Sequence, residues 1–161
     1  MLEKLNKLIF CLLFVVFSHS GISQTYVYKG NFKSPQNIVF NILEGELREK
    51  NYSYGHPVLL TIRDNQIFKN RSISLLDVLF TYRNGFLFLG YSDNPYDIVY
   101  NYDGEHIYYR DRQYAIDIVF SIYMDGIYPG PTNFVSDVMF TIDGPYTDTE
   151  LFAILYALGI L

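Results

Sequence analysis

The side chains that could carry out chemistry are few in this sequence, and they stand far apart. His56 precedes Pro57 in a predicted loop, while His106 begins a predicted strand in a different part of the chain. The sequence contains no Ser-His-Asp, Cys-His or HExxH arrangement and no glycine-rich phosphate loop. We therefore interpret both histidines as surface residues, and we expect no catalytic residues, no cofactor and no enzymatic activity.

Four aspartates recur at a constant spacing of twenty residues. If the chain closes into a barrel, they form part of a carboxylate ring at one rim, and such a ring could attract cations. Each carboxylate would nevertheless lie one radius from the barrel axis, which is too far to share an ion. Because aspartate also accepts hydrogen bonds from nearby backbone amides at turns, we expect a structural role and no metal site. These residues are Asp77, Asp97, Asp117 and Asp137.

Tyrosine is abundant, with 16 residues and no tryptophan. Aromatic surfaces can bind glycans or peptides, but tyrosine also fills half-buried sheet positions with its hydroxyl at the water boundary. We interpret most of them as sheet and core residues. Residues 91–96 and 128–134 interrupt the repeat described below, and binding sites tend to lie on such loops. A ligand site, if the protein has one, is expected there, and the sequence leaves its ligand unknown.

The chain from residue 37 onward contains a repeat with a period of twenty residues and no insertion or deletion, and the four aspartates are part of it. Its six copies share a short segment rich in β-branched and aromatic residues, which is typical of a strand. A second, weaker strand follows the first five copies after a turn, at about 46–48, 66–69, 86–89, 106–109 and 126–128, and residues 26–29 belong to the same class. The turns are predicted at 44–45, 64–65, 84–85, 103–104 and 125–126, where Asn-Gly and Asp-Gly pairs favour hairpins. The six copies begin at Asn37, Pro57, Asp77, Asp97, Asp117 and Asp137.

Alternation along each first strand sorts its side chains onto two faces. In the first copy, Ile38, Phe40 and Ile42 share an apolar face that is predicted to point inward. Val39 and Asn41 share the other face, on which a small polar residue recurs in every copy. We predict that this polar ring points outward, since a slip of one residue would invert both faces. Its members are Asn41, Thr61, Thr81, Asn101, Ser121 and Thr141.

The tail of the chain predicts a helix over residues 147–161. Thr147 and Glu150 stand in the arrangement of a capping box, Tyr146 and Leu151 in that of a hydrophobic staple. After Glu150 no charged side chain occurs. A helix that is apolar on all sides must be buried on all sides, and this one is too short to span a bilayer.

Twelve short antiparallel strands can remove their edges by closing into a barrel whose bore is wide enough for an extra element. We therefore predict a mainly β fold: a twelve-stranded antiparallel barrel of six 20-residue hairpin repeats with a buried apolar C-terminal helix. A six-bladed propeller usually needs four strands per blade, and a flat solenoid would not explain the apolar tail.

The N-terminus has the pattern of a signal peptide. Lys4 and Lys7 precede an apolar run, and small residues follow it. We predict a signal peptide over residues 1–23, with cleavage after Ser20 as the alternative, and one mature domain over residues 24–161. An uncleaved anchor helix is the other interpretation. Cys11 leaves with the signal, and bulky Phe10 before it disfavours a lipoprotein.

Export and charge limit the classes of partner. The formal charge is −5, with 12 basic and 17 acidic residues. An acidic domain is a poor match for nucleic acid, whose affinity rests largely on neutralised phosphates. The basic residues are concentrated before Gly90, and the acidic ones after it.

The Gln-first mature end resembles those of exported proteins from Bacteroidota-type bacteria.

The pattern D-[IV]-[VLM]-[FY]-[TNS]-[IY] stands at Asp77, Asp97, Asp117 and Asp137, and in weaker form at Asn37 and Pro57. It resembles the β-flower proteins, small bacterial families of symmetric hairpin barrels, with six hairpins here rather than four. This resemblance covers essentially the whole mature chain, and it implies a fold without an established activity. Twelve strands around a central helix are also similar to the tubby C-terminal fold and its scramblase-like relatives. Tubby-type domains bind phosphoinositides through basic residues, and this acidic chain has no matching cluster.

These observations predict an exported, non-enzymatic barrel that serves as a binding or envelope-associated module. The alternative is a lipid- or membrane-interacting protein whose C-terminal helix leaves the barrel. We expect a monomer, with a protein, glycan or lipid of the cell envelope as its partner.

Overall fold

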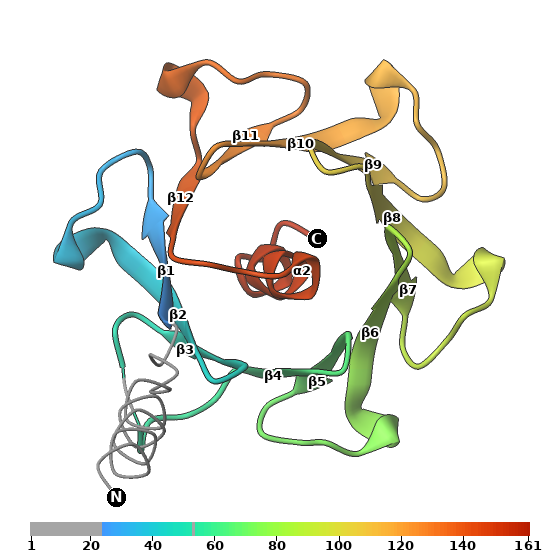
Figure 1. Cartoon of the computed structure of the whole chain (residues 1–161), viewed down its shortest axis with the longest axis horizontal. Helices are drawn as coiled ribbons and strands as arrows, with labels where there is room; N and C mark the ends of the chain where they lie inside the picture. The colour runs from blue at the N-terminus through green and yellow to red at the C-terminus, as the bar shows by residue number, and fades with distance from the viewer. Residues whose placement is uncertain (1–23, 53) are drawn as a thin grey trace, which may run out of the picture.

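The computed structural model describes residues 24–52 and 54–161, and in these ranges the chain forms a closed antiparallel barrel around a helix (Figure 1). The predicted signal peptide, residues 1–23, lies outside the described residues. Neighbours in the sequence are neighbours in the barrel, and β1 completes the ring by pairing with β12, where Val27 lies opposite Ile142. The predicted twelve-stranded barrel with a C-terminal helix is confirmed.

The strands are short and their bounds follow the repeat. They are β1 Gln24–Lys29, β2 Ile38–Leu43, β3 Glu46–Glu49, β4 Leu60–Arg63, β5 Gln66–Lys69, β6 Val78–Arg83, β7 Phe86–Leu89, β8 Ile98–Tyr102, β9 His106–Tyr109, β10 Ile118–Tyr123, β11 Gly126–Pro129 and β12 Phe140–Asp143. The helix α2 covers Asp148–Ala157.

Two kinds of connection alternate around the ring. Tight turns join β2 to β3 and its equivalents at one end of the strands, while longer loops at the other end project outward (Figure 1). We call these loops petals 1 to 6; they cover residues 30–37, 50–59, 70–77, 90–97, 110–117 and 130–139. Petals 1 and 3 to 6 contain a short 3₁₀ turn: η1 Pro35–Asn37, η2 Leu75–Asp77, η3 Pro95–Asp97, η4 Ala115–Asp117 and η5 Val135–Asp137.

These turns shift the start of the strands relative to prediction. Asn37 and its equivalents, predicted as the first strand residues, end the 3₁₀ turns instead, so that most strands begin one residue later. In the second and sixth copies the strand begins only at Leu60 and Phe140.

A β-bulge corrects the predicted division of faces. Val27 and Tyr28 of β1 pair with Phe40 and Ile38, so Val39 has no partner in this register. Val39 was predicted to point outward, but it packs against the core cluster beside Phe40. Ile38 was predicted to point inward, but it pairs with Tyr28 and is not part of that cluster. The extra residue lets two successive side chains reach the interior, which simple alternation does not allow. The same shift recurs between β5 and β6, β7 and β8, and β9 and β10.

One predicted turn is wrong. The connection between β10 and β11 is made by Met124 and Asp125, not by Asp125 and Gly126, because Gly126 occupies the strand position of Glu46 in the repeat. Met124 takes the left-handed conformation with φ of 51°. A Cβ on Gly126 would approach the ring of Tyr128 to 2.6 Å, so the glycine makes room for this buried ring.

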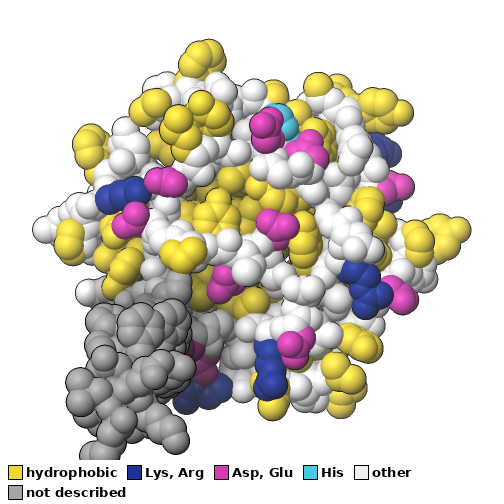
Figure 2. Space-filling model, viewed as in Figure 1, with side chains coloured by type: hydrophobic (Ala, Val, Ile, Leu, Met, Phe, Trp, Pro, Cys, Tyr) yellow, Lys and Arg dark blue, Asp and Glu magenta, His cyan; other side chains and the backbone are white. Residues whose placement is uncertain are grey.

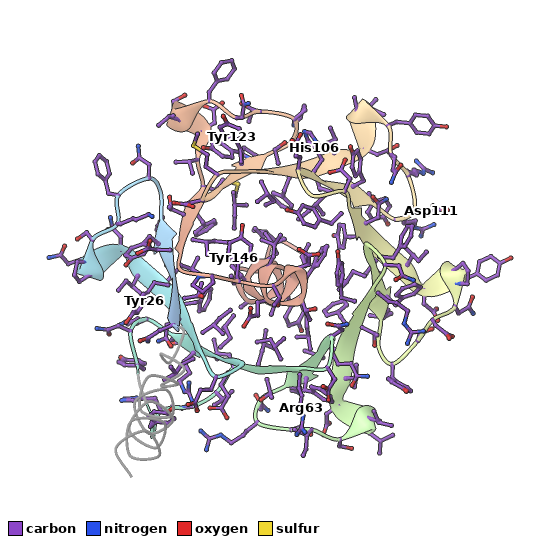
Figure 3. All side chains as sticks on the ribbon, in the orientation of Figure 1. Tyr26, Arg63, His106, Asp111, Tyr123 and Tyr146 are labelled. Atoms are coloured by element: carbon purple, nitrogen blue, oxygen red, sulfur yellow. The ribbon has the colours of Figure 1, made fainter. Side chains whose placement is uncertain are left out.

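The helix lies in the bore of the barrel, with side chains filling the space up to the wall (Figure 3). Its capping box is present as predicted: Thr147 N donates to Glu150 Oε2 at 2.7 Å, and Glu150 N donates to Thr147 Oγ1 at 3.2 Å. Residues 151–155 are fully buried and belong to the core cluster with the inner side chains of the strands. Tyr82 and Tyr102 pack against Phe152, with ring centroids 5.4 and 6.4 Å apart.

The helix is shorter than predicted. It ends at Ala157 rather than at Leu161, because Gly159 takes φ of 69° and Ile160 N donates back to the carbonyl of Leu155. This is a Schellman ending, which glycine favours. No helix in the described ranges has the length and apolar character needed to span a membrane.

Candidate functional site

Each petal is fastened to the barrel wall by its polar-ring residue. Asn101 Nδ2 donates to the carbonyls of Arg110 and Arg112 at 2.8 and 2.7 Å, and Asn41 does the same in petal 2. Elsewhere a hydroxyl makes a single bond of this kind, as Ser121 does to the carbonyl of Gly130. The ring lies on the outer face as predicted, but its residues in five of the six copies are buried, because the petals fold over them. These five residues are Asn41, Thr81, Asn101, Ser121 and Thr141.

The repeated aspartates hold the petals internally. Ser72 and Ser92 donate to Asp77 and Asp97 at 2.6 Å, and Thr132 donates to Asp137 at 3.0 Å. In petal 5 the partner is Arg112, whose Nη1 lies 3.5 Å from Asp117. The role is structural, as we expected, but the partner is a side chain five residues earlier rather than a backbone amide. In the described part of the chain, no group of three His, Cys, Asp or Glu residues could hold a metal ion.

The two histidines lie in separate surroundings. His56 stacks on Tyr52 in petal 2, with ring centroids 4.2 Å apart. His106 begins β9, where its Nδ1 lies 3.9 Å from Asp103 (Figure 3). Nothing in this arrangement brings them to one site.

Three tyrosines gather where the helix enters the barrel. Tyr82 donates its hydroxyl to Asp148 at 2.9 Å, and Tyr102 donates to the carbonyl of Gly104 at 2.8 Å. Burial raises the pKa of Tyr102 to about 12, and burial together with the Asp148 bond raises the pKa of Tyr82 further. Tyr146 lies beside the helix (Figure 3), and burial raises its pKa as well. Elevated pKa values keep these phenols neutral, which suits packing rather than acid–base chemistry.

A family model described as "6-fold beta flower protein" matches residues 27–155. The chain belongs to this family. The match covers most of the barrel and the buried part of α2, which agrees with the resemblance inferred from the repeat. Comparison with curated proteins and with solved structures gave no match.

The petals of this beta flower expose large apolar side chains at equivalent positions. Leu76, Tyr96 and Ile116 are 96%, 95% and 92% exposed, and each is the middle residue of its 3₁₀ turn. Apolar side chains also gather near the ends of the petals in Figure 2. Together we call these residues the apolar arc: Leu75, Leu76, Tyr96, Tyr114, Ile116, Phe134 and Val135, all exposed and all in petals 3 to 6.

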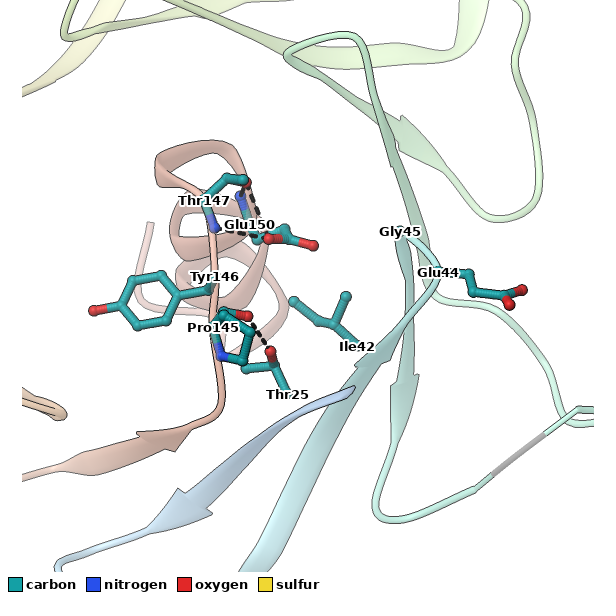
Figure 4. A pocket seen from close by; sticks show the side chains of 8 residues that line it. All are labelled: Thr25, Ile42, Glu44, Gly45, Pro145, Tyr146, Thr147 and Glu150. Carbon is teal, nitrogen blue, oxygen red and sulfur yellow. Dashed lines mark hydrogen bonds between the residues drawn. The ribbon is translucent and has the colours of Figure 1, made fainter. Parts of the chain in front are cut away.

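Two hollows lie at the ends of the bore. A cavity of about 390 Å³ at the start of α2 is lined by Thr25, Ile42, Glu44, Tyr146 and Glu150 among others (Figure 4). Glu150 is already engaged in the capping box, and Glu44 points away from the helix (Figure 4). At the other end, Leu60, Leu79 and Tyr156 line a cavity of about 420 Å³. Neither holds a convergent set of polar groups.

The loops that we singled out from the sequence contribute to the petals. In petal 4, Tyr91, Ser92 and Asp93 line a cavity of about 110 Å³. Residues 128–134 span the start of petal 6, where Phe134 is exposed.

The sequence did not lead us to two features of the structure. The first is the part of the apolar arc in petals 3 and 5. The sequence indicates it by an aliphatic residue at two equivalent repeat positions, Leu76 and Ile116. The second is Arg48, which is fully buried in β3. Its signal is an arginine at a repeat position that is otherwise aromatic, and comparing the second strand of each hairpin would have found it.

Proposed function

We propose that this beta flower is an exported, non-enzymatic binding module that holds a protein of the cell envelope on its apolar arc. The observation that carries the proposal is the near-complete exposure of Leu76, Tyr96 and Ile116 in three successive petals. Single exposed apolar residues are ordinary, but large apolar residues that recur at one position of three neighbouring petals offer a repeated contact to a partner.

The regular spacing supports a multivalent contact. Because the repeat contains no insertion, equivalent petal residues lie at equivalent positions on the ring, and one extended partner can contact several of them. Two of the three residues are aliphatic, which favours a protein surface over a glycan, since sugar rings stack best on aromatic faces. The later half of the chain holds 11 acidic and 2 basic residues, so a partner with a basic rim fits best.

The alternative is a membrane-interacting protein of tubby-like architecture. Exposed apolar petals also favour a lipid interface. Release of the helix from the barrel is disfavoured, because residues 151–155 are fully buried and each large apolar side chain loses about 1.5–3 kcal/mol on exposure. A lipid-bound form would therefore use the petals and keep the helix inside.

Combined substitution of Leu76, Tyr96 and Ile116 by serine tests the proposal. These side chains are almost fully exposed, so the variant should fold like the wild type while losing retention by envelope fractions of the native cells. Met124→Ser is the control, because Met124 is exposed in a tight turn at the other end of the strands.

Unchanged retention of the triple variant would rule out the arc as the binding surface. Flotation with protein-free liposomes separates the alternatives: recovery of wild-type protein with the vesicles would favour lipid over protein. Recovery of the native protein in the cytoplasm with residues 1–23 attached would contradict export.

A further inference from the structure

Arg48 departs from the repeat at a buried position. The equivalent residues, spaced by twenty, are Tyr28, Phe68, Phe88, Tyr108 and Tyr128, all buried. Each lies opposite a polar-ring residue on the neighbouring strand, as Arg48 lies opposite Asn41. An aromatic ring fills this position without the cost of burying a charge, whereas a buried guanidinium must be paired. Replacing a buried ion pair by hydrophobic residues of similar volume often stabilises a protein. Packing alone therefore does not explain an arginine here.

The contacts of Arg48 leave part of the guanidinium without a partner. Its Nη2 donates to Oε2 of Glu46, and the guanidinium carbon lies 5.8 Å from the centroid of the Tyr54 ring. Its Nε and Nη1 are buried and have no hydrogen-bond partner among the described residues. Buried donors of this kind are rare in folded proteins and point to a water or an ion.

A second arginine shares the same carboxylate. Oε1 of Glu46 lies 3.2 Å from Nε of Arg71, which belongs to petal 3. One negative charge thus faces two positive charges, and the group carries a formal charge of +1 in a chain whose total is −5. Lys50, whose ammonium lies 6.0 Å from the Tyr52 ring, adds a further positive charge to petal 2. Glu44 is hydrogen-bonded to the Tyr54 hydroxyl beside Arg48, so it is the unpaired donors of Arg48, and not the net charge of the region, that favour an anion.

The carboxylate of Glu46 also marks a route from solvent. The side chain of Arg48 is 0% exposed, that of Glu46 is 23% exposed and that of Arg71 is 64% exposed. Glu46 therefore stands between the buried guanidinium and the surface. A group that displaces this carboxylate would approach Arg48 from the exposed side of Glu46.

We propose that Arg48 and Arg71 form a binding site for a phosphate or sulfate group, for which the Glu46 carboxylate competes. A tetrahedral oxyanion can accept from Nη2 and from a neighbouring nitrogen of Arg48 while a further oxygen faces Arg71. The Glu46 carboxylate directs one oxygen to each arginine, so it accepts from only one nitrogen of Arg48, Nη2. The group is a free oxyanion or part of a larger molecule, and the site lies outside the apolar arc, so it is independent of the proposed function.

Thermal unfolding in phosphate, in sulfate and in chloride at matched ionic strength tests the site. At low concentrations, where their general exclusion from protein surfaces stabilises little, phosphate or sulfate should still raise the midpoint of the wild type above that in chloride. Arg48→Tyr restores the residue type of the repeat, so it should fold at least as well in chloride while losing the oxyanion effect, with affinity reduced about tenfold or more. Glu46→Gln should increase the oxyanion effect, because the competing charge is gone.

Two exposed arginines provide a matched pair should Arg48→Tyr fail to fold. Arg71→Gln should weaken phosphate binding, and Arg112→Gln, an exposed arginine of petal 5 paired with Asp117, should leave it unchanged. Vesicles of phosphatidylcholine with and without phosphatidic acid distinguish a lipid headgroup from the free ion. Equal midpoints in phosphate, sulfate and chloride, an oxyanion effect that survives Arg48→Tyr, or equal binding by the two glutamine variants would each overturn the site.

Discussion

Asn41 and Asn101 stand opposite the paired carbonyls that begin petals 2 and 5, and each makes two hydrogen bonds from one amide nitrogen. The other ring positions use a hydroxyl, which has only one hydrogen to donate. The recurrence of small polar residues was visible in the sequence. Their burial was not, because it depends on the petals folding back over the outer face of the barrel.

Asn101→Ala should destabilise the fold by about 1–3 kcal/mol, because two part-buried hydrogen bonds that hold petal 5 are lost. Urea unfolding followed by circular dichroism measures the change in the free energy of unfolding. The matched control is Thr61→Ala, which removes a single bond to the carbonyl of Asn70 at a half-exposed site and should cost about 0.5–1.5 kcal/mol. An Asn101 variant no less stable than the Thr61 variant would show that the amide does not fasten the petal.

Arg48 shows at the same scale why sequence reasoning stopped short of a site. The repeat is evident in the six first-strand segments, which align without gaps. The second strands vary more in sequence, so an unusual residue among them is harder to recognise. The buried environment of an arginine is a property of the closed ring and of the loop above it, and neither is encoded in residues 46–49 alone.

Among the elements, the second strands at 66–69, 86–89 and 106–109 were predicted with their observed bounds. The predicted turn before each of these strands sets the residue at which the strand begins. The bulge at Val39 was not predicted, because a bulge changes the register without changing composition. The turn at Met124 was missed because an Asp-Gly pair one residue later gave the stronger local signal. In both cases the tertiary pairing outweighed the local preference.

The helix is the element whose ends are best defined. Thr147→Ala should lower the free energy of unfolding by about 1 kcal/mol, since it removes the oxygen that accepts from Glu150 N. Thr147→Ser keeps that oxygen and should cost clearly less. Chemical denaturation of both variants gives the comparison, and equal losses would argue against the cap.

For the whole molecule, closure was predictable because twelve strands with an apolar inner face leave no stable open arrangement, and the tail supplied the missing core. The number of petals followed from the repeat. The end of α2 was not predicted, because Gly159 stops the helix before the end of the apolar tail. The exposure of Leu76 and Ile116 was not predicted either, because it depends on each petal projecting outward from the barrel.

The central claim is that α2 fills the bore of the barrel and belongs to its core. Native-state hydrogen exchange of the backbone amides of residues 151–155 tests it most directly, with the amides of Leu47 and Ile67 in the barrel wall as the reference. Leu151 N donates to Thr147 and the five side chains are fully buried, so these amides should exchange only through global unfolding, at the free energy of the wall amides. Exchange of the helix amides through a separate opening of much lower free energy, with the wall still protected, would contradict the claim.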